Sequence, residues 1–137
     1  ETSGPAPVVV DPSVAIQQRV ALARQYIGAG DWDNAKRNLE LAAEIDAENP
    51  EVYEAFALVY QSSGEFELAE SNFRSALEAK TVASRVRNNF AAFLYSRGRF
   101  GEAAEQFEIV TADSLYSERP RAFVNLGLAQ LQLGQRN

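Results

Sequence analysis

Two pairs of glutamates have the spacing of acid/base groups: Glu67 with Glu70, and Glu102 with Glu105. A separation of three residues places both carboxylates of a pair on the same face of a helix. Acid/base catalysis also requires a pocket that perturbs at least one of the two carboxyl groups. We expect both pairs on outward faces of helices, and we therefore interpret them as solvated surface charge.

The chain contains no cysteine and no histidine among its 137 residues. Structural zinc sites are built from Cys and His, thiol catalysis needs a Cys, and the Ser-His-Asp arrangement needs an imidazole base. The composition excludes these chemistries. We therefore expect no catalytic residue, no metal ligand and no cofactor, and we predict that the protein is not an enzyme.

The formal net charge of the chain is -6, from 19 acidic and 13 basic residues. Proteins that bind nucleic acid or anionic lipid electrostatically present a basic face to the phosphates. The acidic excess therefore argues against both ligands and favours a protein partner. The longest apolar stretch near the start covers residues 8–10, which is far shorter than the roughly 18 residues of a membrane-spanning helix.

One pattern recurs along the chain: a glycine, any residue, an aromatic residue, two further residues and an alanine. It begins at Gly30, Gly64 and Gly98, which gives a period of 34 residues. This period is typical of tetratricopeptide repeats, whose units are helix-turn-helix pairs, and the chain resembles that superfamily from Ile16 onward. We therefore predict an all-α fold, a tetratricopeptide-repeat solenoid of antiparallel helix pairs with three full repeats and the first helix of a fourth.

The predicted array occupies residues 14–137, with units at 16–49, 50–83 and 84–119 and a partial unit at 120–137. Residues 1–13 are rich in proline and turn-forming residues, so we expect a flexible N-terminal tether. Unit two has Tyr53 and Tyr60 where the superfamily favours Trp or Tyr, and it is the best match. Because the chain stops where a further helix would begin, we expect either that the natural chain continues or that this end self-associates.

Small residues recur at two positions of each unit. The eighth position holds Ala23, Ala57, Ala91 and Gly127, and the twentieth holds Ala35, Ala69 and Ala103. We predict that the two helices of a unit approach closely there. Large apolar residues at neighbouring positions, including Leu39, Phe73 and Phe107 at the twenty-fourth, should form the core, and the recurring glycines should end helices in the left-handed conformation.

The superfamily resemblance implies that the first helices of the units line a concave groove. The predicted partner-binding residues are Gln17, Val20, Arg24 and Ile27 in unit one, Glu51, Glu54, Leu58 and Gln61 in unit two, Arg85, Asn88, Ala92 and Tyr95 in unit three, and Arg121, Val124 and Leu128 in unit four. This mixture suits an extended or helical segment of a partner. A merely solvated groove is the alternative, since repeat proteins also bind through other surfaces. The lack of Lys in the lining disfavours the carboxylate clamp of chaperone-binding members of the superfamily.

Three segments depart from a generic repeat: residues 88–95, the run Leu115-Tyr116-Ser117-Glu118-Arg119, and residues 125–127. Together they resemble the PilW/PilF family of type IV pilus biogenesis lipoproteins. The run from Leu115 to Arg119 is a junction that lengthens unit three by two residues. We predict that Leu115 and Tyr116 pack between units three and four while Glu118 and Arg119 begin the next helix. Contact with a partner is an equal alternative for Tyr116 and Arg119.

This family resemblance implies a function and a location. The implied protein is a periplasmic pilotin, which is held at the outer membrane by a lipid anchor and helps secretin subunits to reach that membrane and assemble into the pore for the pilus. The expected partner is a secretin subunit, and membrane contact is expected only through an anchor that this chain does not contain. Two alternatives stay open: another envelope or cytosolic adaptor that docks hydrolases or chaperones, and a regulatory segment cut from a larger enzyme.

Overall fold

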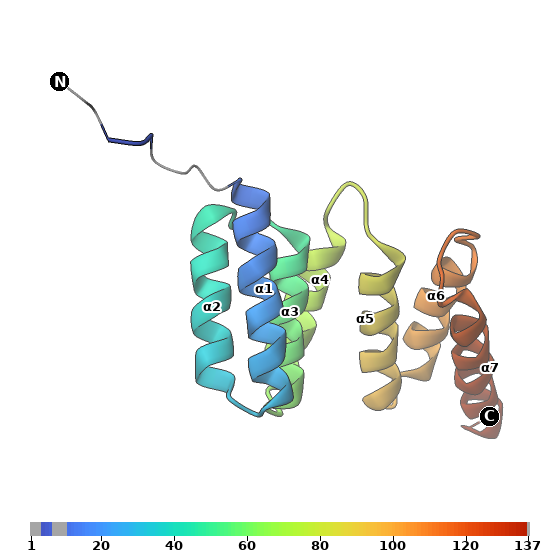
Figure 1. Cartoon of the computed structure of the whole chain (residues 1–137). Helices are drawn as coiled ribbons and strands as arrows, with labels where there is room; N and C mark the ends of the chain where they lie inside the picture. Colours follow the sequence, from blue (N-terminus) through green and yellow to red (C-terminus); the bar gives the residue numbers. More distant parts are fainter. Residues whose placement is uncertain (1–3, 7–10, 137) are drawn as a thin grey trace.

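The computed structural model describes residues 4–6 and 11–136 of the chain. In these residues it contains seven α-helices: α1 (Pro12–Gly28), α2 (Trp32–Ile45), α3 (Pro50–Ser62), α4 (Phe66–Leu77), α5 (Ser84–Ser96), α6 (Phe100–Thr111) and α7 (Arg119–Arg136). Helices α1 and α2, α3 and α4, and α5 and α6 form antiparallel pairs, and α7 packs against α6 at the far end of the row (Figure 1). The predicted solenoid of three helix pairs and a further first helix is confirmed.

The first helix begins where a side chain can cap it. The Asp11 carboxylate accepts a hydrogen bond of 2.9 Å from the backbone N–H of Ser13, and Pro12 occupies the first turn. Capping satisfies a free N–H at the helix end, and proline fits there because it has no N–H to lose. Pro12 and Ser13 are therefore helical although the sequence assigned them to the tether. Residues 1–3 and 7–10 of that tether lie outside the described part.

Each helix pair turns at a glycine with a positive φ angle. These angles are 74° at Gly30, 83° at Gly64 and 76° at Gly98. The left-handed conformation is accessible to glycine at little cost, because glycine has no Cβ. The prediction that these glycines end the first helices of the units is confirmed.

The small residues lie where the paired helices are closest. All six alanines at the eighth and twentieth unit positions are fully buried: Ala23, Ala35, Ala57, Ala69, Ala91 and Ala103. Gly127 differs, because it is exposed and a Cβ built on it would have no neighbour within 4 Å. Among the residues that the structure describes, no second helix packs on this side of α7.

Ala69→Leu is expected to lower the free energy of unfolding by about 1–3 kcal/mol, because a leucine overpacks the contact between α3 and α4. Urea denaturation followed by circular dichroism measures the loss. Glu67→Leu, at an exposed position of the same helix, controls for the added apolar atoms and should change stability much less. Equal stability of Ala69→Leu and the wild type would show that the predicted repeat register is wrong.

The buried side chains form two clusters that meet at α3. One fills unit one and one side of α3, and it includes Leu39 and Ala55. The other extends from the second side of α3 to α7. Its centre is Phe73 of α4, whose ring centroid lies 5.6 Å from that of Phe90 and 5.4 Å from that of Phe93. Aromatic side chains therefore join unit two to unit three.

Candidate protein-binding groove

The first helices α1, α3, α5 and α7 carry the predicted lining of the groove. Most of these side chains are exposed or half-buried. Two are not, since Val20 is 4% exposed and Glu54 is 0% exposed. Val20 belongs to the apolar core of unit one. The prediction that these two side chains contact a partner is therefore wrong.

Glu54 of α3 is a buried carboxylate that accepts hydrogen bonds from side chains of two other helices. Arg24 of α1 donates a hydrogen bond to it at 2.6 Å, and Arg85 of α5 donates to both oxygens at 2.6 and 2.7 Å. Asn89 of α5 adds a hydrogen bond of 3.0 Å. A buried charge is costly unless it is paired and hydrogen-bonded, and these four hydrogen bonds meet that requirement. We call Arg24, Glu54, Arg85 and Asn89 the Glu54 cluster; it connects units one, two and three.

The two arginines of the Glu54 cluster also face solvent. The side chain of Arg24 is 37% exposed and that of Arg85 is 42% exposed. Burial alone would lower the pKa of Arg85, but the hydrogen bonds and charge of Glu54 raise it above its ordinary value. The accessible charge in this part of the groove therefore comes from two guanidinium groups and from the exposed carboxylate of Glu51, which lies 3.8 Å from Arg85.

The junction between units three and four is only partly as predicted. Leu115 is 92% exposed, so it does not pack between the units. Its backbone N–H donates to the Asp113 carboxylate at 3.1 Å, and this tight turn directs the side chain into solvent. Glu118 is also exposed, Tyr116 is half-buried, and Arg119 is the first residue of α7.

Arg119 has a structural role at the start of α7. Its Nε donates a hydrogen bond of 2.6 Å to the backbone carbonyl of Thr111, and its guanidinium lies 5.1 Å from the ring centroid of Phe123. These contacts fasten the end of α6 to α7. They favour the interpretation of Arg119 as part of a stiff joint over that of a partner contact.

Tyr116 lies close to charges from both neighbouring units. Burial and the charge of Glu118 raise the pKa of Tyr116, while the positive charges of Arg85 and Arg121 act in the opposite direction. The half-buried phenol is therefore surrounded by charges of both signs.

A small pocket opens between α5, α6 and α7. Its volume is about 100 Å³, and it is lined by Ala92, Tyr95, Phe107, Asn125 and Leu128. Three of these residues belong to the predicted lining. Phe107 and Asn125 do not, although Asn125 shares the sixth unit position with Asn89 and could have been found by that equivalence. The pocket combines largely apolar walls with one amide.

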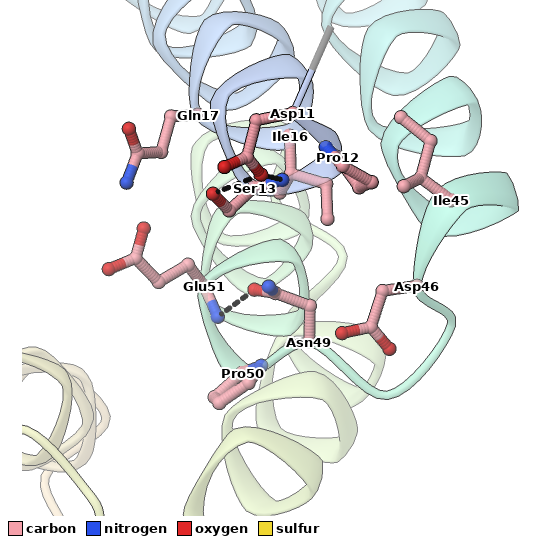
Figure 2. A pocket seen from close by; sticks show the side chains of 10 residues that line it. All are labelled: Asp11, Pro12, Ser13, Ile16, Gln17, Ile45, Asp46, Asn49, Pro50 and Glu51. Carbon is pink, nitrogen blue, oxygen red and sulfur yellow. Dashed lines mark hydrogen bonds between the residues drawn. The ribbon is translucent and has the colours of Figure 1, made fainter. Parts of the chain in front are cut away.

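A larger cavity of about 640 Å³ lies at the start of α1 and α3 (Figure 2). The predicted lining residues Gln17 and Glu51 belong to it. Figure 2 shows that its other polar groups serve the helix ends, since Asp11 accepts from Ser13 and Asn49 accepts from the backbone N–H of Glu51 at 2.9 Å. The described residues contain no group of three or more acidic residues placed to bind a metal ion. We interpret this cavity as a capping region.

The glutamate pairs with acid/base spacing are not brought together as pairs. Glu67 and Glu105 are exposed. Glu70 and Glu102 instead share Arg99, which donates hydrogen bonds of 3.1 Å to Glu70 and 2.8 Å to Glu102. The hydrogen bonds from Arg99 lower the pKa of Glu70. These contacts link α4 to the start of α6 and hold units two and three together.

Glu70→Gln is expected to lower the free energy of unfolding by less than about 1 kcal/mol at neutral pH, because the ion pair is partly exposed. The pKa of Glu70 is lowered in the folded state, so its contribution is present above the ordinary value of 4.5 and disappears as the pH falls through the lowered value. Urea denaturation at pH 7 and pH 3 should therefore show a larger difference from the wild type at pH 7 than at pH 3. Glu105→Gln, at an exposed position in the middle of α6, is the control and should show little difference at pH 7.

Within the described part of the chain, no helix has both the length and the apolar character needed to cross a bilayer.

Known proteins with this architecture identify its family. The model of the tetratricopeptide repeat family matches residues 50–81, which is the unit that the sequence indicated as the best match. PilF of Pseudomonas aeruginosa superposes with a TM-score of 0.85 and 36% identity, over 90% of this chain and 55% of PilF. PilW, a widely conserved type IV pilus biogenesis factor, superposes with a TM-score of 0.80 and 28% identity, over 88% of this chain and 55% of PilW. The chain is a tetratricopeptide-repeat protein that resembles PilF and PilW.

This tetratricopeptide-repeat protein spans about half the length of both relatives. The type III secretion chaperone SycD of Yersinia enterocolitica, solved with a peptide of the translocator YopD, has a TM-score of 0.72 at 15% identity, over 92% of this chain and 98% of SycD. At this identity only the fold is shared. No match was found among curated proteins. The architecture is that of a protein-interaction scaffold.

Proposed function

We propose that this tetratricopeptide-repeat protein is a scaffold of type IV pilus biogenesis, which assists secretin subunits in reaching the outer membrane and assembling into the pore. The observation that carries the proposal is the similarity to PilF, at 36% identity over 90% of this chain. The similarity to PilW, a type IV pilus biogenesis factor, adds support. Because the chain spans 55% of each relative, it would supply part of such a scaffold.

The groove supports a binding role. Its accessible lining combines guanidinium groups from Arg24 and Arg85 with exposed apolar side chains on α7, of which Val124 is 62% exposed and Leu128 is 45% exposed. Mixed lining of this kind holds an extended or helical segment of a protein. Proteins of this fold generally act as scaffolds, and our proposal includes no catalysed reaction.

The proposed partner is a secretin subunit, and the proposed place is the periplasmic face of the outer membrane. Nucleic acid is not a proposed partner, because the net charge of the chain is -6 and phosphate binding needs a basic surface. Contact with the membrane would come only from a lipid anchor outside this chain. The role requires modest affinity, since the scaffold must release its partner on assembly.

The test uses a strain that lacks the gene. We expect heat-resistant secretin multimers in the outer-membrane fraction to be lost or strongly reduced, and to return when the full-length wild-type gene is restored. A full-length gene with Glu44→Gln, an exposed position of α2 outside the groove, should restore them equally well. Normal multimers in the deletion strain would refute the proposal.

A further inference from the structure

Units three and four repeat part of the Glu54 cluster. With units that start at Pro50, Ser84 and Pro120, the donors Arg85 and Asn89 stand at the second and sixth positions of unit three. Arg121 and Asn125 stand at the same positions of unit four. The same two donor types are therefore presented one unit further along the groove.

The burial pattern supports this equivalence. Val86 and Phe93, at the third and tenth positions of unit three, are 2% and 1% exposed, and the Phe93 ring contacts Phe73 of the preceding unit. Ala122 and Ala129 occupy the same positions of α7, and both are 0% exposed. Helix α7 thus turns the same face toward unit three that α5 turns toward unit two, although the junction adds two residues before it and α7 packs far more closely against α6 than α5 packs against α4.

The carboxylate is what the second set of donors lacks. Glu54 is the fifth residue of unit two, but the fifth residue of unit three is Asn88. The Asn88 side chain is shorter and neutral, and its Oδ1 is buried without a hydrogen-bond donor. Among the described residues, the side chains of Arg121 and Asn125 have no hydrogen bond or ion pair. This interface presents a guanidinium and an amide with no anion between them.

The small pocket adjoins one of these donors, because Asn125 is one of its walls. The pocket is open where Ala92 occupies the ninth position of unit three, whereas the same position of unit two holds the larger Leu58, which packs against the core. An apolar cavity of about 150 Å³ accommodates benzene. A pocket of about 100 Å³ is therefore suited to an aliphatic side chain.

Arg121 supplies a positive charge that can attract an anion at this interface. It is exposed, and its charge and that of Arg85 act on the pKa of Tyr116 in the direction opposite to the exposed Glu118. The chain as a whole carries a net charge of -6. A guanidinium without an ion pair offers a charge-complementary contact to an acidic ligand segment.

We propose that the interface between units three and four binds a partner segment in which an Asp or Glu side chain lies close to an aliphatic side chain. The partner's carboxylate accepts hydrogen bonds from Arg121 and Asn125, as Glu54 does from Arg85 and Asn89. The aliphatic side chain enters the pocket. The inference rests on the proposed function only in requiring a protein partner. A third donor is missing, because Leu58 stands at the unit position of Arg24, so the affinity is moderate and the binding reversible.

The first test is an NMR titration of the ¹⁵N-labelled chain with two blocked peptides. Both are acetylated and amidated Gly/Ser peptides with one leucine; one has a glutamate two residues away on each side, and the other has glutamines there. We expect the glutamate peptide to shift the amide signals of Ala92, Asn125 and Leu128 and to bind at least about tenfold more tightly, as charge-assisted hydrogen bonds imply. Arg121→Gln should abolish this preference, while Arg37→Gln, at an exposed position of α2, should keep it.

Three results would overturn the proposal. They are the absence of saturable shifts at this interface, equal binding of the two peptides, and stronger binding of the glutamine peptide once its C-terminal carboxylate is left free. The last result would assign the site to a chain terminus instead of an acidic side chain.

Asn88→Glu tests the same geometry without relying on a peptide. It places a carboxylate at the unit position of Glu54, where Arg121 and Asn125 should bind it and exclude the glutamate peptide. We expect at least a tenfold loss of peptide binding, and a higher urea midpoint than in the double variant Asn88→Glu/Arg121→Gln. The uncharged Asn88→Gln is the control and should retain peptide binding. The absence of coupling between positions 88 and 121 would contradict the proposal.

The secretin assay separates this proposal from the proposed function. Full-length genes with Arg121→Gln or Asn88→Glu should give fewer multimers than the wild type. If both support normal multimers while deletion of the gene abolishes them, the binding site is refuted and the proposed function stands. If deletion has no effect but the peptide results are as expected, the proposed function is refuted and the site stands.

Discussion

Phe73→Ala is expected to lower the free energy of unfolding by about 3–5 kcal/mol, the range for truncating a buried phenylalanine. Phe73 is 0% exposed, and its ring contacts those of Phe90 and Phe93 across the interface between units two and three. The truncation therefore removes apolar contacts and leaves a cavity where two units meet. Urea denaturation followed by circular dichroism measures the loss.

The control is Leu68→Ala on the same helix, where the side chain is 47% exposed and a much smaller loss is expected. A domain of this size has a total stability of about 5–15 kcal/mol, so Phe73→Ala is expected to remove a substantial part of it. Phe73→Leu, which leaves a smaller cavity, keeps the measurement possible if the alanine variant does not fold. A loss below about 1 kcal/mol for both variants would contradict the packing described for Phe73.

The double variant Arg24→Gln/Arg85→Gln is expected to lower the free energy of unfolding by about 3–5 kcal/mol, because it leaves Glu54 as a buried carboxylate without a cationic partner. Glu54→Gln removes the same ion pairs but should lose less, about 1.5–3 kcal/mol. The reason is the difference in exposure, since Glu54 is 0% exposed whereas the arginines are 37% and 42% exposed and can turn to water. Urea denaturation at pH 7 compares the two variants.

Arg37→Gln/Lys80→Gln is a suitable control for the loss of two positive charges, because both side chains are exposed. This control should lower the free energy of unfolding by less than either change in the Glu54 cluster. A larger loss for Glu54→Gln than for the arginine double variant would contradict the view that the buried carboxylate depends on its partners.

The helices could be predicted because their determinants are local. The glycine-aromatic-alanine pattern repeats every 34 residues, and each glycine is at a helix end where φ must be positive. The burial of the spaced alanines follows from the same repeat, as the fully buried Ala57 and Ala69 show. The resemblance to PilF and PilW was also present in the sequence, and the structural similarity supports it.

The burial and pairing of the groove residues could not be predicted in the same way. Glu54 was assigned to the surface because its unit position lines the groove, but its burial depends on Arg24 and Arg85, which lie about 30 residues away on either side. Which side chains pair across units is set by the distance between helices and not by any local pattern. Leu115 was misplaced for a related reason, because the turn at Asp113 decides where it points.

Helix α3 contributes side chains to both buried clusters, with Val52 and Val59 in one and Ala57 in the other. In a repeat array, stability is the sum of the units and of the interfaces between neighbours. Melting of α3 would therefore remove an interface from both sides at once, and neither the first unit nor the third would keep its complete core. This one helix of 13 residues therefore couples the folding of unit one to that of the units that follow it.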